Sequence, residues 1–193
     1  SPSGVIAPEY LEGAAAMLRS QGFTVSEGKH ARAVSGRFAG TDEERLQDLQ
    51  EALDDPTVDL ILCSRGGYGL VRLIDKLRFD GFAAHPKWVV GFSDTTVLHA
   101  ALNRQGFPSL HGHMARYLSE LPVEDATVEH LFNIVNKNIF PVYQLPLSKD
   151  SSHYNRPGRA EGILVGGNLS VLMGLRGTPC EPIYKGSILL IED

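Results

Sequence analysis

Apolar residues in this chain follow two spacings, one typical of buried strands and one typical of amphipathic helices. Residues 58–64 (VDLILCS) and 88–90 (WVV) are almost continuously apolar, as expected of strands buried on both faces of a parallel sheet. We also predict strands at 23–26, at 107–110 and, near the end of the chain, at 187–191.

Helical patterns lie between these predicted strands. Thr41 and Glu44 have the spacing of a capping box, which predicts the start of a helix that runs to about Leu53. Further helices are predicted over 8–21, 69–77, 95–104 and 123–136. Strands that alternate with helix-length segments are typical of the α/β class, and we predict a doubly wound, mostly parallel sheet.

The pattern changes after about His113. Residues 148–162 are polar and contain Pro and Gly, as in a loop or linker, and a Gly-rich segment with a further helix follows. We predict an N-terminal α/β domain over 1–145, a linker over 146–162 and the beginning of a smaller β-rich C-terminal domain over 163–193. Because the chain stops within a predicted strand, we expect this second domain to be incomplete as given.

Composition narrows the classes of partner. The 193 residues carry 18 Lys and Arg against 23 Asp and Glu, a net charge of −5, which argues against a nucleic-acid binder. Two cysteines, Cys63 and Cys180, exclude a disulfide framework and a cysteine-based zinc site, and they fit a reducing compartment. We expect no membrane partner, because the most apolar long stretch contains polar residues and several glycines.

The first segment with candidate chemistry is Gly91-Phe92-Ser93-Asp94-Thr95. It follows one predicted strand and precedes a helix, the context of a nucleophile elbow that exposes a serine hydroxyl above a sheet. The amide of Asp94 could then stabilise an oxyanion. Ser, Asp and Thr are also preferred helix caps, and spacing alone favours that alternative.

The second segment is SRGGYG at 64–69. Glycines at a strand–helix turn let backbone N–H groups approach a ligand closely. The segment matches neither a dinucleotide fingerprint, because Arg72 stands where a third glycine would be, nor a P-loop. The alternative is a tight turn with a glycine at positive φ, and motif statistics favour it.

Histidines and a strand-end carboxylate complete the candidates. His111 and His113 form an H-x-H pair that could bind metal, but the sequence places no third ligand nearby. His99 lies six residues after Ser93 on a predicted helix, so we expect it to face away from that hydroxyl. Glu192 could orient a histidine as the third member of a triad, or be an exposed strand-end acid.

Taken in order, these segments are more specific than any one alone. SRGGYG, GFSDTT, LHGHM, GGNLSVLMGLRGTP and GSILLIED resemble the L,D-carboxypeptidase family of serine peptidases, which includes murein tetrapeptide carboxypeptidases and microcin C self-immunity peptidases. The resemblance covers nearly the whole chain. It implies a two-domain, commonly homodimeric enzyme without cofactor or metal, cytoplasmic in the members that recycle murein, that hydrolyses an L,D bond of a muropeptide or other small peptide, such as the bond before a terminal D-Ala.

The resemblance also implies residue roles. Ser93 is the expected nucleophile, Glu192 the carboxylate that orients the base, and the amides of Asp94 and Gly67 the oxyanion hole. The family's catalytic histidine lies downstream of the glutamate, and none of the seven histidines matches its position. We therefore expect the chain as given to lack its base.

Two alternatives stay open at this point. In the first, His111 or His113 is the base, because both follow a strand that could neighbour the one before Ser93. In the second, the chain is a non-catalytic binding module of flavodoxin-like type that holds an anion or a peptide. Basic residues such as Arg65 are candidates to meet substrate carboxylates.

Overall fold

Two parallel sheets organise the computed structural model, which describes residues 1–137, 139, 140, 142 and 152–193. Strands β1 (Leu60–Leu62), β2 (Trp88–Gly91) and β3 (Leu110–His111) form one sheet in the order β1-β2-β3. Strands β4 (Ile163–Asn168) and β5 (Ser187–Glu192) form the other. The helices are α1 (Pro8–Ser20), α2 (Asp42–Asp54), α3 (Asp80–Ala84), α4 (Thr96–Arg104), α5 (Ala115–Glu120), α6 (Ala126–Lys137) and α7 (Leu169–Gly174).

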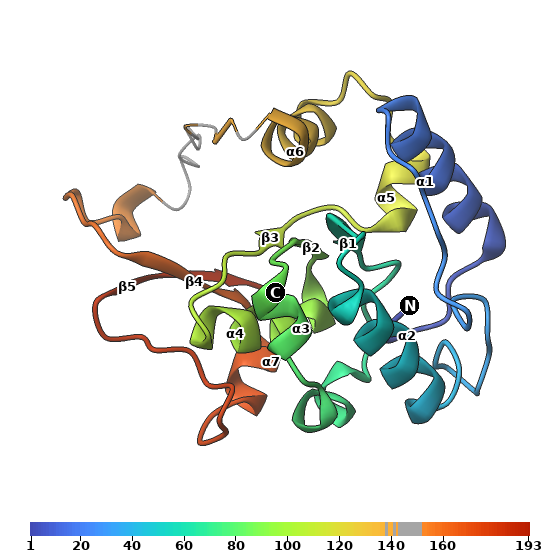
Figure 1. Ribbon diagram of the computed structural model, residues 1–193. Coiled ribbons are helices and arrows are strands. Elements are labelled where there is room, and N and C mark those ends of the chain that lie inside the picture. Colours follow the sequence, from blue (N-terminus) through green and yellow to red (C-terminus); the bar gives the residue numbers. More distant parts are fainter. Residues whose placement is uncertain (138, 141, 143–151) are drawn as a thin grey trace.

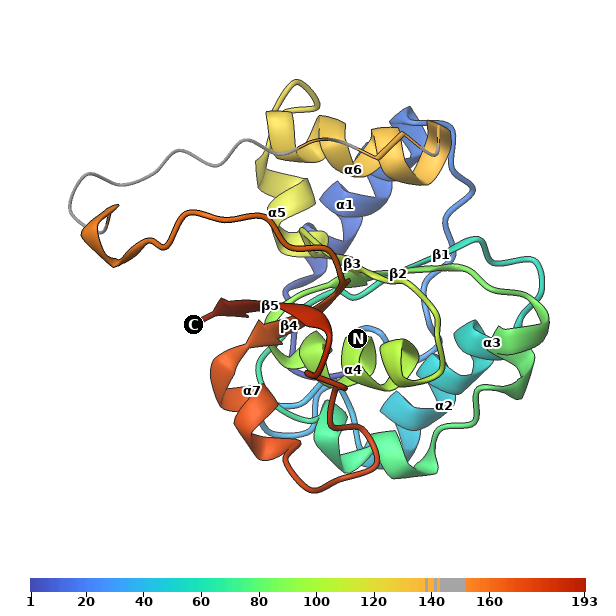
Figure 2. The same cartoon turned by 90° about the vertical axis from the view of Figure 1, so that its left-hand side faces the viewer.

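Helices cover both faces of the three-stranded sheet, which confirms the predicted α/β class. Figure 2 shows α1, α5 and α6 on one side of β1–β3 and α2, α3 and α4 on the other. The pleat of β2 sends alternate side chains to opposite faces. Val89 packs in the cluster formed with α2 and α4, whereas Val90 packs in the cluster formed with α1 and α5, and both are fully buried. The continuous apolar run at 88–90 therefore marks a strand buried on both faces.

Helix α2 begins where the capping box predicts. Thr41 Oγ1 accepts from the Glu44 N–H at 3.2 Å, and Glu44 Oε2 accepts from the Thr41 N–H at 2.8 Å. Leu49 and Leu53 on its inner face pack in the core between α2, α4 and the three-stranded sheet. Such caps contribute about 1 kcal/mol, which helps a helix with few apolar residues to form.

The predicted strand at 23–26 is wrong, because the structure has no strand there. A strand needs a hydrogen-bonded neighbouring strand. A cavity lies between this segment and β1. Ser26 and Gly28 line one side of that cavity, of about 380 Å³, and Leu60–Leu62 of β1 line another. Its apolar residue Phe23 packs instead against Phe132, with 6.1 Å between the ring centroids.

Two other predicted elements differ in form. The helix predicted over 69–77 is a pair of 3-10 turns, Leu70–Arg72 and Ile74–Lys76, that bury Leu70, Leu73 and Ile74. The strand predicted over 107–110 starts later, because only Leu110 and His111 pair with β2. Both elements lie close to where the pattern predicts them, while backbone pairing decided their form and their bounds.

The C-terminal strands pack against the N-terminal sheet domain through α4. The backbone N–H of Asn168 donates to Thr96 Oγ1 at 3.0 Å, and β4 and β5 lie beside α4 and α7 (Figure 1). The predicted boundary at residue 145 and residues 146–151 of the predicted linker lie outside the described residues. Among the described helices, none is long and apolar enough to cross a membrane.

Candidate active site

The loop between β2 and α4 holds Ser93 in a strained backbone conformation. Ser93 has a φ of 60°, and among the described residues no other non-glycine residue has a positive φ. Such conformations cost roughly 1–3 kcal/mol and persist where the surrounding structure imposes them. Gly91 permits the turn, because a Cβ there would lie 2.7 Å from Thr95 Oγ1. The strand, the tight turn and the helix thus have the geometry that the nucleophile-elbow prediction requires.

The capping alternative for this loop is wrong. Neither Phe92 nor Thr95, the residues at the two N-cap positions, forms a side-chain cap hydrogen bond. The Asp94 carboxylate turns away from α4 and accepts from Ser3 Oγ at 2.5 Å and from the Leu70 N–H at 3.0 Å. The turn residues therefore join three loops rather than close the end of a helix.

The side chain of Asp94 is a structural feature that the sequence analysis missed. Burial raises the pKa of this carboxyl, although the hydrogen bonds from Ser3 and Leu70 and the nearby Arg45 favour the ionised form. Arg45 is itself fully buried and donates to the carbonyl of Pro2 at 2.6 Å. These contacts hold the first residues of the chain and the glycine-rich loop against the elbow.

The glycine-rich loop after β1 lies directly against Ser93. A Cβ on Gly66 would lie 3.0 Å from Ser93 Cβ and 3.1 Å from Ser93 Oγ, so a larger residue would displace the serine. Gly67 and Gly69 have φ of 116° and 146°, as the tight-turn alternative predicts. The N–H of Gly4 donates to the Gly66 carbonyl at 3.1 Å and fixes the loop from the other side. The segment is both a tight turn and a wall of the site.

Three hydrogen-bonding groups at this end of the sheet are free. Within the described part of the chain, Ser93 Oγ has no hydrogen-bond partner, and the N–H groups of Asp94 and Gly67 donate to no protein acceptor. Gly67 is exposed and Ser93 is half-buried, whereas Asp94, the next residue of the turn, is buried.

Glu192 reaches the same end of the molecule from the second sheet. It is the last residue of β5 and pairs with Asn168, whose N–H contacts Thr96 at the start of α4. Its Oε1 is buried and has no hydrogen-bond partner among the described residues. Glu192 also acts electrostatically on His111, where its charge opposes the lowering of the pKa that burial causes. The exposed strand-end acid considered above is therefore not what forms.

Neither histidine of the H-x-H pair hydrogen-bonds to Ser93. His113 Nε2 lies 2.6 Å from Thr127 Oγ1, and its ring stacks on Tyr117. The ring of His111 lies 6.0 Å from that of Phe92, between centroids. No group of three or more metal-ligating side chains occurs among the residues that the structure describes.

His99 faces away from the Ser93 hydroxyl, as predicted, and its ring contacts the backbone at Gly91, where the turn begins. Its Nε2 lies 2.8 Å from the Gly91 carbonyl, at the end of β2, and its Nδ1 lies 2.8 Å from Ser109 Oγ. Burial lowers its pKa to about 4, so the ring is neutral near pH 7. With Nε2 protonated, His99 donates to Gly91 and accepts from Ser109.

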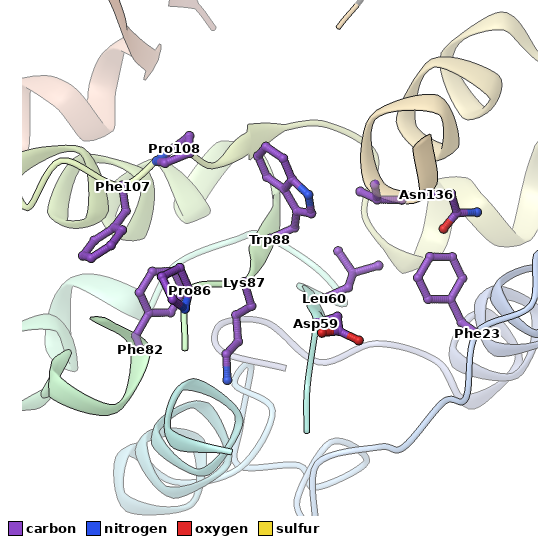
Figure 3. Close-up of a pocket in the computed structure, with 11 residues that line it drawn as sticks. Phe23, Asp59, Leu60, Phe82, Pro86, Lys87, Trp88, Phe107, Pro108 and Asn136 are labelled. Atoms are coloured by element: carbon purple, nitrogen blue, oxygen red, sulfur yellow. The ribbon is translucent and has the colours of Figure 1, made fainter. Parts of the chain in front are cut away.

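A cavity lined by aromatic residues lies at the opposite end of the sheet. It has a volume of about 600 Å³, and Figure 3 shows Trp88, the first residue of β2, at its centre, with Phe82 and Phe107 on one side and Phe23 on the other. Sites in parallel α/β proteins lie at the carboxyl ends of the strands, and this cavity is at the amino ends. Ser93 follows the carboxyl end of β2 and has no part in it.

A parallel α/β fold that carries a strained serine, free amides and an unpartnered carboxylate at the carboxyl ends of its strands has the features of a hydrolase site. A family profile for the LD-carboxypeptidase N-terminal domain matches residues 1–112, and a profile for the LD-carboxypeptidase C-terminal domain matches residues 161–193. The chain belongs to the LD-carboxypeptidase family.

Relatives and solved structures agree with this assignment. A probable murein peptide carboxypeptidase of Bacillus subtilis (strain 168) is 36% identical over 196 residues, which cover 100% of this chain and 60% of the relative. The crystal structure of a muramoyltetrapeptide carboxypeptidase from Oxalobacter formigenes superposes with a TM-score of 0.83 at 33% identity, covering 100% of this chain and 64% of that one. The microcin C7 self-immunity protein MccF, in complex with aspartyl sulfamoyl adenosine, superposes with a TM-score of 0.83 at 28% identity, covering 100% and 66%.

Proposed function

We propose that this protein is a serine-type L,D-carboxypeptidase that releases the terminal D-Ala of a murein tetrapeptide and so serves peptidoglycan recycling. Membership of a carboxypeptidase family and the murein names of its relatives support the reaction class. The chain spans 60% of the length of the Bacillus relative, so the proposal concerns the complete natural gene product.

The observation that carries the proposal is the strained backbone conformation of Ser93, whose φ is 60°. A hydroxyl is a weak nucleophile, and an elbow presents it to a substrate carbonyl without steric interference from neighbouring side chains. Attack would place the developing oxyanion near the amides of Asp94 and Gly67, which are both free to donate. One such donor typically contributes about 10²–10³ in rate.

Glu192 is proposed to orient the general base. An imidazole that receives the Ser93 proton on one nitrogen would donate its other N–H to this carboxylate. The buried, unpartnered Oε1 of Glu192 is an acceptor without a donor, which is costly unless a donor arrives. Since His99, His111 and His113 hydrogen-bond to neither Ser93 nor Glu192, we propose that the base is a different imidazole.

Assembly and location belong to the same proposal. We propose a homodimer in the cytoplasm with domains at 1–145 and 163–193 and a linker at 146–162. Sedimentation analysis would measure the mass of the assembly, and limited proteolysis would test the linker, which should be cleaved before either domain.

The test is release of D-Ala by the complete natural gene product and by its Ser93→Ala variant. The substrate is a tetrapeptide that ends in an L,D bond to D-Ala. Loss of the nucleophile should lower kcat by about 10³-fold or more, because only oxyanion and binding contributions remain. A variant that keeps full activity would remove Ser93 from the reaction.

Two other functions predict different results in the same assay. A microcin-type peptidase would cleave an aminoacyl sulfamoyl nucleotide, the type of ligand in the MccF complex, faster than the tetrapeptide. A non-catalytic module would bind the tetrapeptide without releasing D-Ala, and Ser93→Ala would then change nothing.

A further inference from the structure

A cluster of arginines surrounds one aromatic ring beside the glycine-rich loop. The guanidinium carbons of Arg37, Arg45 and Arg72 lie 5.6, 5.0 and 5.4 Å from the centroid of Phe38, within the range of cation–π contacts. One carboxylate, Asp42, pairs with both Arg45 and Arg72. Asp42 therefore offsets the charge of Arg45 and Arg72, with Asp94 also near Arg45 and Glu43 near Arg72.

Arg37 is held differently from the other two arginines of this cluster. Its guanidinium also lies 5.5 Å from the centroid of Tyr68, so two rings hold it in place. Among the described residues the Arg37 guanidinium forms no hydrogen bond or ion pair, and the residue is exposed. Arg72, by comparison, is bonded to Asp42 and also feels the charge of Glu43. Arg37 therefore presents a positioned guanidinium whose donors are all available.

This guanidinium lies beside the glycine-rich loop, which forms a wall of the candidate site. Tyr68 follows Gly66, which touches Ser93, by two residues, a span of at most about 7 Å. The Arg37 backbone is separated from Gly66 by one intervening segment, since the Val5 N–H donates to the Arg37 carbonyl at 3.2 Å and the Gly4 N–H donates to Gly66. Two such spacings put about 10 Å between the backbones of Arg37 and Gly66.

Arg65 on the same loop is less suited to this role. Its Nη1 already donates to the Val5 carbonyl at 2.6 Å, and its stem covers Gly4. It therefore contributes positive charge to this edge while part of its donor set is occupied.

We infer that Arg37, whose guanidinium lies over the ring of Tyr68, is a specificity-determining residue that binds a carboxylate of the peptide substrate on the acyl side of the scissile bond. This inference rests on the proposed carboxypeptidase function. Only one residue lies beyond the bond that a carboxypeptidase cleaves, so every other residue of the substrate lies on the acyl side. A guanidinium held over two aromatic rings can bind both oxygens of a carboxylate.

The test compares two peptides that end in the same L-Lys–D-Ala bond and carry either Glu or Gln directly before the Lys. For the complete natural gene product, kcat/KM for the Glu peptide should exceed that for the Gln peptide about tenfold, mainly through KM. In the Arg37→Gln variant this ratio should fall to about one. Because Arg37 is exposed, the ratio should also shrink as salt is raised.

Arg104→Gln is the matched control, since it removes the same charge from an exposed residue at the far end of α4. It should keep the tenfold ratio, and the melting temperatures of all three proteins should agree. A ratio near one in the unsubstituted protein, or a tenfold ratio that survives Arg37→Gln, overturns the inference while the carboxypeptidase function stands. Failure to cleave either peptide overturns the proposed function and the inference with it.

Discussion

Two carboxylates at the candidate site, Asp94 and Glu192, have opposite environments. Asp94 lies on the N-terminal side and accepts hydrogen bonds from Ser3 and from the Leu70 N–H, which tie together three loops. Glu192 lies at the end of β5, and its buried Oε1 has no partner among the described residues. A buried acceptor that is satisfied stabilises the fold, whereas one that is not is available to a donor that arrives later.

Asp94 is therefore a group that stabilises the site, whereas Glu192 is a group available for the reaction. The elbow, the glycine-rich loop and the start of the chain hold each other through contacts internal to the N-terminal half. The second sheet carries Glu192 and is joined to that half through the hydrogen bond from Asn168 to Thr96 of α4. Three experiments test this division, and they are ordered by the size of the expected effect.

The largest effect is expected from removing each of the two carboxylates in turn. Glu192→Gln should lower kcat of the complete gene product by about 10⁴-fold, as loss of an orienting carboxylate does in serine peptidases, with little change in stability. Asp94→Ala should lower the free energy of unfolding by about 1–3 kcal/mol, because it leaves two donors without an acceptor. Steady-state kinetics and urea unfolding of both variants measure the two quantities.

If Glu192→Gln were as active as the unsubstituted protein, the carboxylate would have no role in the reaction. If Asp94→Ala were as stable, its hydrogen bonds would be worth no more than those to water. Either result would break the division between the two residues.

The next effect concerns His99, which supports the elbow. Its pKa is lowered to about 4 in the folded protein from an ordinary value of 6.5. Between these values the unfolded chain binds more protons, so the contribution of neutral His99 is present above pH 6.5 and is lost as the pH falls through about 4. The difference corresponds to roughly 3 kcal/mol at most.

Urea unfolding at pH 7.5 and at pH 4.5 measures this contribution when the protein is compared with its His99→Gln variant. The amide of Gln can still donate to the Gly91 carbonyl but does not titrate. The variant should therefore lose less stability between the two pH values. Equal losses would show that His99 is protonated without cost.

The smallest effect is expected from the contact between the glycine-rich loop and Ser93. Gly66→Ala places a Cβ about 3 Å from Ser93 Cβ and Oγ, which should shift the hydroxyl and lower kcat/KM about tenfold. Gly112→Ala is the control, because its Cβ would meet only Val90 at 3.6 Å, an ordinary contact. Crystal structures of both variants would show whether Ser93 moves, and a Gly66→Ala enzyme of full activity would mean that it need not.

Local patterns predicted much of the fold for a physical reason. An apolar run such as that of Leu60–Leu62 favours a strand, and the capping box at Thr41 closes between residues three apart, so each signal is carried by neighbouring positions in the sequence. The segment 23–26 has a strand-like pattern too, but a strand requires a neighbouring backbone, which the structure does not supply there. The turn at Ser93 was recognisable because strand, turn and helix are consecutive.

Local sequence patterns could not predict which side chains contact one another at the site. Ser3 and Asp94 are 91 residues apart along the chain, and Arg37 lies over the ring of Tyr68 from a different loop. The sequence by itself determined the α/β class, the position of the elbow and the family. The tertiary structure decided which polar atoms are satisfied and which stay free, because satisfaction depends on which distant groups the fold brings within hydrogen-bond distance.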